Sequence, residues 1–343
     1  MKKRLRLILG FAISLLFLYL AMRKIQWGAV WQLFREGNYW YLLPAVLILV
    51  CINWVRAYRW RLLMYPETHL PLPRVFWFVN IGYFFNNTLP AKAGEVVRAI
   101  LVGRLIPGGI GQALSTLLIE RLLDVLPLVV LLVILLPFVP LPSWAIRGGL
   151  VFGGVAIGGT VVLLLLARFG ARGVEWLWRF LGRVPLLGHP KLRKALENLL
   201  DGFRVLLIPR LLPGIVLSSA LVWLGYAVFN YTLMAAFKMT YLPFSAAALV
   251  LCATGFSMVL PSSPGAMGVF EWAGVQALAV FGLAESLAFG YTLGLHVFTN
   301  VALILLGLVG LLTEGLSYAE LRHKLSASPQ EQPQTIPSSG ERV

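Results

Sequence analysis

The chain has 343 residues, of which 59% are hydrophobic and 13% are charged, and its mean hydropathy is +0.82. An ordinary soluble domain carries roughly 25% charged residues, so these values exclude a water-soluble protein and indicate a polytopic membrane protein. The net charge is +15. Basic residues beside apolar segments are topology signals and contacts to anionic lipid, so we expect no nucleic-acid partner.

Six apolar segments are long enough to cross a bilayer as helices, which takes about 20 residues. In chain order they cover residues 5–22, 40–58, 112–137, 145–167, 211–237 and 286–315. The first follows a basic start, as a signal peptide does. No small-residue cleavage site follows it and further spans do, so we interpret it as a retained signal anchor.

The basic residues predict the orientation of these segments. With the N-terminus inside, residues 56–110, 168–210 and the C-terminus are cytoplasmic, and the inner side holds 23 of the 29 Lys and Arg residues. This asymmetry predicts a multi-pass plasma-membrane protein with both termini in the cytoplasm. The basic loop 168–210 is expected along the anionic leaflet. The Ser-, Pro- and Gln-rich tail 326–343 is expected to be disordered beyond a transmembrane domain of residues 1–325.

Two further apolar segments are interrupted in the same way. Residues 86–95 and 258–271 each run from an apolar approach through Leu-Pro into small residues and then a glutamate. Duplicated apolar segments with Gly/Pro breaks are typical of transporter folds built from repeats. In the predicted topology one break lies on the inner side and the other on the outer side.

The two breaks decide the predicted fold. The apolar arms 72–89 and 243–260 are each followed by a shorter return, which predicts two re-entrant hairpins of broken helices. The complete prediction is an all-α membrane protein with six full transmembrane helices and two re-entrant hairpins in an inverted repeat. Non-helical backbone at membrane depth must be buried or line a wet cavity, so a central polar cavity is expected. The alternative is that one or both are ordinary full spans kinked at proline.

The third span carries three ionisable residues, which are costly and rare inside a membrane. Glu120, Arg121 and Asp124 share a helix face by their spacing. Arg121 and Asp124 are either a buried pair that fixes packing or part of a functional site. Glu120 is then a surplus charge that requires a proton or a cation such as Lys92 or Arg98.

Residues directly after the breaks are candidates for anion binding. Glu95 and Arg98 are three apart where the chain re-forms a helix, so they are able to pair locally, and Glu271 follows the second break. The helix N-termini after Pro90 and Pro264 would direct amide donors at an anion such as a phosphate.

Three glycines near the breaks, Gly94, Gly265 and Gly268, would let the backbone approach a ligand. The alternative is that Pro and Gly only end one helix and start the next. We favour the site, because the construction occurs twice in opposite orientations.

Other chemistry finds no support in the sequence. The two cysteines, Cys51 and Cys252, lie in apolar segments, and no metal-ligand spacing or nucleotide-binding motif occurs. His296 in the last span is interpreted as a hydrogen-bonded packing residue. We therefore expect no metal, no cofactor and no catalytic residue, which makes an intramembrane lipid phosphatase the least favoured function.

The motifs around Pro90, at 120–124 and around Pro261, in this order and spacing, resemble the flippase-like family named after the transmembrane region of lysylphosphatidylglycerol synthase. The resemblance covers most of residues 5–315. It implies movement of a polar or charged lipid between leaflets. The resemblance also implies that larger relatives carry a soluble domain that attaches an amino acid to phosphatidylglycerol. We expect no such synthase activity here, because the largest loop and the tail are too short for that domain. Lys92 departs from the arginine that the family favours, which preserves charge but not a bidentate fork.

The leading hypothesis is a lipid translocase whose two hairpins and third span enclose a groove for a phosphate-bearing head group. The alternative is a scaffold or accessory subunit that presents lipid to a separate glycosyl- or aminoacyl-transferase. The candidate substrate-binding residues are Asn87, Pro90, Lys92, Gly94, Glu95, Arg98, Glu120, Arg121, Asp124, Pro261, Pro264, Gly265, Gly268 and Glu271.

Overall fold

The computed structural model describes residues 2–65, 70–89, 92–181, 193, 197, 200, 202–258, 266–319 and 321, and these residues form helices, turns and connections without a strand. Four helices are long and apolar enough to cross a membrane. They are Tyr39–Leu63, Ile146–Phe169, Leu212–Ala236 and Glu285–Thr313. The protein is therefore an all-helical membrane protein, as predicted.

These four spans correspond to α3 (Leu42–Leu63, preceded by the short η1, Tyr39–Tyr41), α7 (Ser143–Phe169), α10 (Leu212–Ala236) and α13 (Glu285–Thr313). The other two predicted spans are also helices, α1 (Lys2–Met22) and α6 (Gly109–Leu135). The 27 residues of α6 reach about 40 Å at 1.5 Å each, enough for a bilayer. One boundary was wrong: the second span ends at Leu63 rather than at 58.

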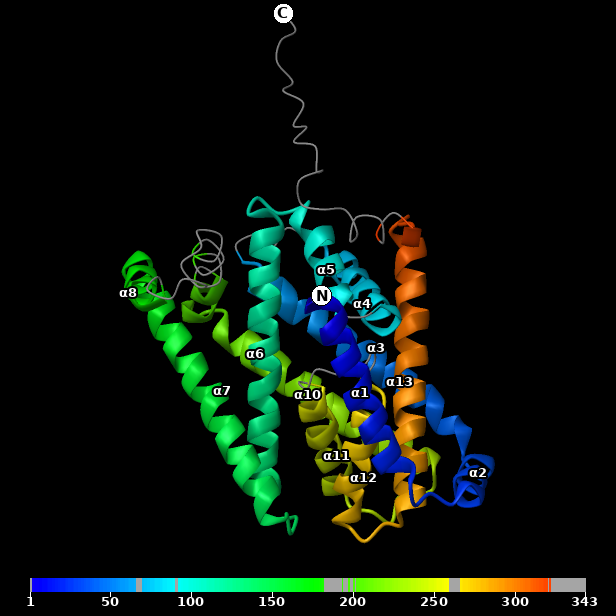
Figure 1. Ribbon diagram of the computed structural model, residues 1–343. Helices are drawn as coiled ribbons and strands as arrows, with labels where there is room; N and C mark the ends of the chain where they lie inside the picture. The colour runs from blue at the N-terminus through cyan, green and yellow to red at the C-terminus, as the bar shows by residue number, and fades with distance from the viewer. Residues whose placement is uncertain are drawn as a thin grey trace, which may run out of the picture.

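Two helical hairpins are present at the predicted positions. The first consists of α4 (Leu72–Thr88) and α5 (Ala93–Gly103), and the second of α11 (Phe244–Ser257) and α12 (Val269–Ala279). Each return helix has 11 residues, against 17 and 14 in the approaching helices. Figure 1 shows the two hairpins towards opposite ends of the long helices.

The residues between the two helices of each hairpin, 90–91 and 259–265, lie outside the described residues. They include Pro90, Pro261, Pro264 and Gly265. The predictions for these four residues are therefore not placed by the structure.

Helix order supports an internal repeat. In the first half α5 begins at Ala93 and α6 at Gly109, and in the second α12 begins at Val269 and α13 at Glu285, so one shift relates both pairs. The same shift places Glu95 on Glu271 and Glu120 on His296, so two ionisable positions of the first half coincide with ionisable positions of the second.

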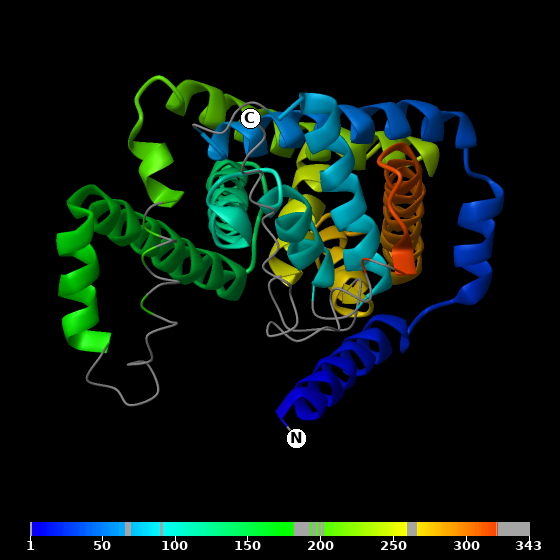
Figure 2. The same ribbon diagram turned by 90° about the horizontal axis from the view of Figure 1, so that it is seen from above.

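The core is built by helix pairs that are distant in sequence. In Figure 2, α3 and α10 run side by side along one edge of the molecule, and the two helices are in extensive contact. The hairpin helix α4 packs along α13, and α1 packs on α12, where the rings of Phe17 and Trp272 lie 5.0 Å apart. Each hairpin is thus held between long helices.

Short peripheral helices lie at opposite ends of the molecule in Figure 1, α2 (Trp27–Arg35) at one end and α8 (Ala171–Leu181) at the other. Trp31 on α2 and Trp40 on η1 are exposed, and so is Trp176 on α8. Tryptophan is enriched where a membrane meets water. After the short η2 (Arg204–Leu207), the chain enters α10.

A buried charge cluster at α3, α5 and α6

The candidate site is a group of seven charged side chains from three helices, which we call the charge cluster. It contains four arginines and three carboxylates: Arg56 and Arg59 of α3, Glu95 and Arg98 of α5, and Glu120, Arg121 and Asp124 of α6. Positive charges therefore exceed negative charges by one.

Asp124 is bound from two helices. Its carboxylate accepts hydrogen bonds from Arg59 Nη2 at 2.6 Å and from Arg56 Nη1 at 2.9 Å, both on α3. Arg121 Nη1, one turn away on α6, lies 3.3 Å from the same carboxylate. The predicted Arg121–Asp124 pair is confirmed, but α3 provides the shorter contacts.

Glu120 is fully buried and contacts three arginines. Arg98 Nη2 donates to it at 2.8 Å, Arg56 Nη1 lies at 3.3 Å and Arg59 Nη2 at 3.7 Å. Arg98 was one of the cations expected to neutralise Glu120, and that contact is confirmed. Glu120 therefore joins α3, α5 and α6 at one point.

Aromatic rings and hydroxyls hold the arginines in place. The guanidinium of Arg98 lies 4.1 Å from the ring of Trp60, a cation–π distance, and Trp60 Nε1 donates to Thr116 on α6 at 2.9 Å. Arg59 donates to Ser219 of α10 at 3.2 Å. The cluster is thus enclosed by protein on several sides.

The edge of the cluster is more accessible than its centre. Arg121 Nε lies 3.0 Å from Glu95 Oε1, and the two side chains are 35% and 24% exposed. The expected local pair of Glu95 with Arg98 is not formed. The reason is that α6 packs on α5 and provides a partner for each residue. Arg121 pairs with Glu95, and Glu120 pairs with Arg98.

Two members of the cluster, Arg56 and Arg59, were missed from the sequence. They were assigned to the cytoplasmic loop 56–110, whereas α3 continues to Leu63. A signal was available: Asn53, Arg56 and Trp60 are spaced by three and four residues, as one helix face requires. All of these side chains are buried.

The corresponding place in the second half holds a single pair. His296 Nδ1 of α13 lies 2.5 Å from Glu271 Oε1 of α12, and Phe270 stacks on the imidazole with ring centroids 4.3 Å apart. Glu271 Oε2 also accepts the N–H of Gly268 at 2.6 Å, at the start of α12. His296 is therefore buried, stacked and bonded to Glu271.

At two of the candidate glycines, Gly94 and Gly268, the space beside the backbone is filled by neighbouring protein rather than open to a ligand. A Cβ on Gly94 would lie 1.8 Å from the carbonyl oxygen of Gly82 on α4. A Cβ on Gly268 would lie 2.2 Å from the carbonyl oxygen of Ser14 on α1. The space that we expected a ligand to use at Gly94 and Gly268 is therefore occupied by close helix packing.

Lys92 and Asn87 lie beside the first break. Lys92 has a left-handed backbone with φ 53° and an exposed side chain, whose Nζ lies 3.5 Å from the carbonyl oxygen of Met258 at the end of α11. The two hairpins therefore approach each other at their breaks. Asn87 Nδ2 is buried and has no hydrogen-bond partner within the described ranges. Lys92 does not contact Glu120.

Among the residues that the structure places, no group of three or more His, Cys, Asp or Glu side chains is positioned to hold a metal ion. The charge cluster contains four arginines, each of which contacts a carboxylate. Its buried arginine Nε atoms on Arg56, Arg59 and Arg98 make no hydrogen bond within the described part of the chain.

Comparison with known proteins agrees with this architecture. The family model described as "Lysylphosphatidylglycerol synthase TM region" matches residues 7–307, a range that includes both hairpins and the charge cluster. A UPF0104 membrane protein of Methanothermobacter thermautotrophicus is 22% identical over 285 residues, which cover 76% of this chain and 81% of that protein. No solved structure matches the chain. The chain belongs to the family of the lysylphosphatidylglycerol synthase transmembrane region.

Proposed function

We propose that this protein is a lipid translocase that moves a phospholipid, or another lipid with a polar head group, between the leaflets of the plasma membrane. The observation that carries the proposal is the charge cluster, which concentrates four arginines inside an otherwise apolar helical protein. Ionisable groups at membrane depth are expensive and mark substrate or ion pathways. A surplus of one positive charge suits a phosphate.

The proposal includes the finer topology. All six long helices cross the bilayer, the two hairpins re-enter from opposite faces, and both termini are cytoplasmic. The placement of the hairpins towards opposite ends of the long helices supports this arrangement, as do the exposed tryptophans of α2 and α8 (Figure 1). The basic loop 168–210 then lies on the cytoplasmic leaflet, as the positive-inside rule requires.

Head-group binding begins at the edge of the cluster. A phosphate competes with Glu95 for Arg121, because the Arg121–Glu95 pair is its most accessible ion pair. The planar guanidinium of arginine donates two parallel hydrogen bonds to a carboxylate or to a phosphate in the same way. Replacing the Glu95 carboxylate by a lipid phosphate therefore costs little free energy. Lys92 provides a second cation where the hairpin breaks meet. Asn87, Pro90, Pro261, Pro264 and Gly265 remain candidates at those breaks.

Transport by the purified protein tests the proposal. Labelled phosphatidylglycerol and a labelled cationic phospholipid are reconstituted with the protein in liposomes, and the accessible fraction is followed with a membrane-impermeant quencher. Arg121→Gln should abolish transfer of the anionic lipid while the fold persists, because this side chain is partly exposed. Lys24→Ala, which removes an exposed pair with Glu285, is the matched control.

A charge reversal separates lipid binding from structural pairing. Glu95→Arg with Arg121→Glu keeps the pair and the total charge but moves the cation to α5. Transfer that survives in this double variant, and equally in Arg121→Gln, would disprove a phosphate-binding role for the cluster edge. Loss in Arg121→Gln with partial recovery in the double variant supports it.

One observation favours a second function. Every guanidinium of the charge cluster already contacts a carboxylate, which is also what a static packing device would show. The protein would then be a membrane scaffold or accessory subunit presenting lipid to a separate transferase. This reading predicts no transfer of any labelled lipid by the pure protein, together with a transferase that co-purifies from native membranes.

Cysteine accessibility tests the orientation. In a background without Cys51 and Cys252, a cysteine replacing exposed Trp40 should react with an impermeant thiol reagent added outside cells. A cysteine replacing exposed Arg172 should react only after the membrane is permeabilised. The reverse pattern would invert the proposed topology.

A further inference from the structure

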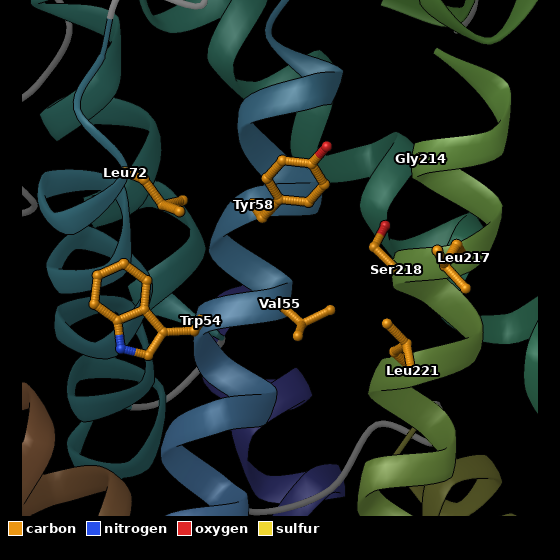
Figure 3. Close-up of a pocket in the computed structure, with 8 residues that line it drawn as sticks. All are labelled: Trp54, Val55, Tyr58, Leu72, Gly214, Leu217, Ser218 and Leu221. Carbon is orange, nitrogen blue, oxygen red and sulfur yellow. The ribbon is translucent and has the colours of Figure 1, made fainter. Parts of the chain in front are cut away.

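A groove outside the charge cluster lies between α3 and α10. Its volume is about 300 Å³. Figure 3 shows the side chains that line it, from both helices and from the start of α4. They are Trp54, Val55, Tyr58, Leu72, Gly214, Leu217, Ser218 and Leu221.

The groove faces away from the charge cluster. Val55 and Tyr58 line it, whereas the cluster arginines Arg56 and Arg59 are the next residues along α3 and are buried on another side. Leu217 and Leu221 of α10 are 60% and 46% exposed. Both helices are long and apolar enough to span a membrane, so the medium that contacts this surface is the bilayer.

Gly214 lets α10 approach α3 closely at the groove. A Cβ there would lie 2.9 Å from Leu62 Cδ1 and 3.7 Å from the Tyr58 hydroxyl. From Gly214 to Leu221 the helix rise gives a length of about 10 Å. A channel of this length and apolar character fits the upper part of one acyl chain.

The charges at one end of the groove are positive. Arg61 lies over the ring of Tyr58, with Cζ 5.8 Å from the ring centroid, and makes no ion pair with any residue that the structure describes. Arg210, just before α10, lies against Tyr65 at the same end of the two helices, with Cζ 5.0 Å from that ring. No carboxylate is among the residues that line the groove.

We propose that the groove between α3 and α10 binds one acyl chain of an anionic phospholipid, with its phosphate beside Arg61. The site does not depend on the proposed translocation. Its lipid braces α3 against α10, on a side of α3 that does not carry the cluster arginines. Ser218 lines the groove and its neighbour Ser219 bonds Arg59, so the same turn of α10 touches both the lipid and the cluster.

Photolabelling locates the lipid. The full chain is reconstituted in liposomes that contain phosphatidylglycerol or phosphatidylcholine with a diazirine on one acyl chain, and labelled peptides are mapped by mass spectrometry. Phosphatidylglycerol should label residues 54–58 and 214–221 about fivefold more than phosphatidylcholine does, since one arginine near the surface favours anionic lipid to this extent. The exposed face of α7 around Val151 and Val155 reports ordinary surrounding lipid.

Matched variants test the two parts of the site. Leu221→Trp fills the groove and should remove most of its labelling, whereas Leu224→Trp, exposed on the same helix but outside the groove, should not. Val55→Trp fills the groove from α3 and replaces Leu221→Trp if that variant does not fold. Arg61→Gln should bring the two lipids to equal labelling, and Arg35→Gln should leave the preference unchanged.

Labelling of the groove no stronger than that of the α7 face would overturn the proposal, because the lipid would then be ordinary surrounding lipid. So would equal labelling by both lipids in the unmodified protein. Transport measured in the same liposomes is a separate result: a protein that moves no lipid yet shows the groove labelling leaves this site standing and removes the translocase.

Discussion

The two halves of the repeat place similar helical hairpins against a long helix but use different chemistry at the contact. In the first half, Glu95 and Glu120 are drawn into a cluster with four arginines. In the second half, the corresponding residues Glu271 and His296 bond to each other. Among the described residues no ion pair links this second pair to an arginine or lysine.

The second half shows that the hairpin architecture does not need a charge cluster. Glu271 caps the start of α12 at Gly268 and is satisfied by one histidine. Burying five charged groups and half-burying two more is a far more expensive solution, because each buried charge must be removed from water and paired. The additional charge in the first half therefore points to a task beyond folding, which is the physical basis of the proposed head-group site.

The largest expected effect comes from removing the central carboxylate of the first half. Glu120→Ala leaves Arg98 without its bonded carboxylate and Arg56 and Arg59 with Asp124 alone, so it should destabilise the protein by about 3–5 kcal/mol. Unfolding in mixed detergent, followed by tryptophan fluorescence, measures it. Retention of wild-type stability would mean that the cluster is wet and loosely paired.

A smaller effect is expected where the first hairpin packs most closely. Gly94→Ala places a methyl group against the carbonyl oxygen of Gly82, and overpacking of this kind costs about 1–3 kcal/mol. The control is Gly154→Ala on α7, where a Cβ would meet nothing within 4 Å. Equal melting temperatures for the two variants would show that the α4–α5 contact is less tight than described.

Breaking the pair of the second half should cost less than breaking the cluster. Glu271→Gln keeps an oxygen for Gly268 but loses the charge beside His296, so we expect about 1–2 kcal/mol. The same variant should retain head-group transfer in liposomes, unlike Arg121→Gln. Transfer lost in Glu271→Gln with an intact fold would contradict the division of roles between the halves.

The smallest effect is expected at the exposed pair of Lys24 and Glu285, which lies at the start of α13. Lys24→Ala should change stability by about 0–1 kcal/mol, since both side chains are largely in contact with solvent. A decrease in melting temperature as large as that of Glu271→Gln would show that solvent-exposed ion pairs contribute substantially to the stability of this protein.

Much of the fold was predictable because hydrophobic length alone identifies long helices, and Pro and Gly mark where α4 and α11 stop. The ion-pair partners of the charged residues could not be predicted from the sequence. Arg98 lies three residues from Glu95 yet binds Glu120, and Glu95 binds Arg121, because these choices depend on how α5 sits on α6. Arg56 and Arg59 were lost for a related reason: a basic residue near the end of a span is usually a loop residue.

The contact between Gly82 and Gly94 has a mechanical consequence. With backbone against backbone and the N–H of Gly94 bonded to Asn86 at 2.9 Å, α4 and α5 cannot slide or open without losing the whole contact. The α4–α5 hairpin therefore moves as one rigid unit. Motion during a transport cycle would have to occur around it, at the Arg98–Glu120 and Glu95–Arg121 ion pairs that join α5 to α6.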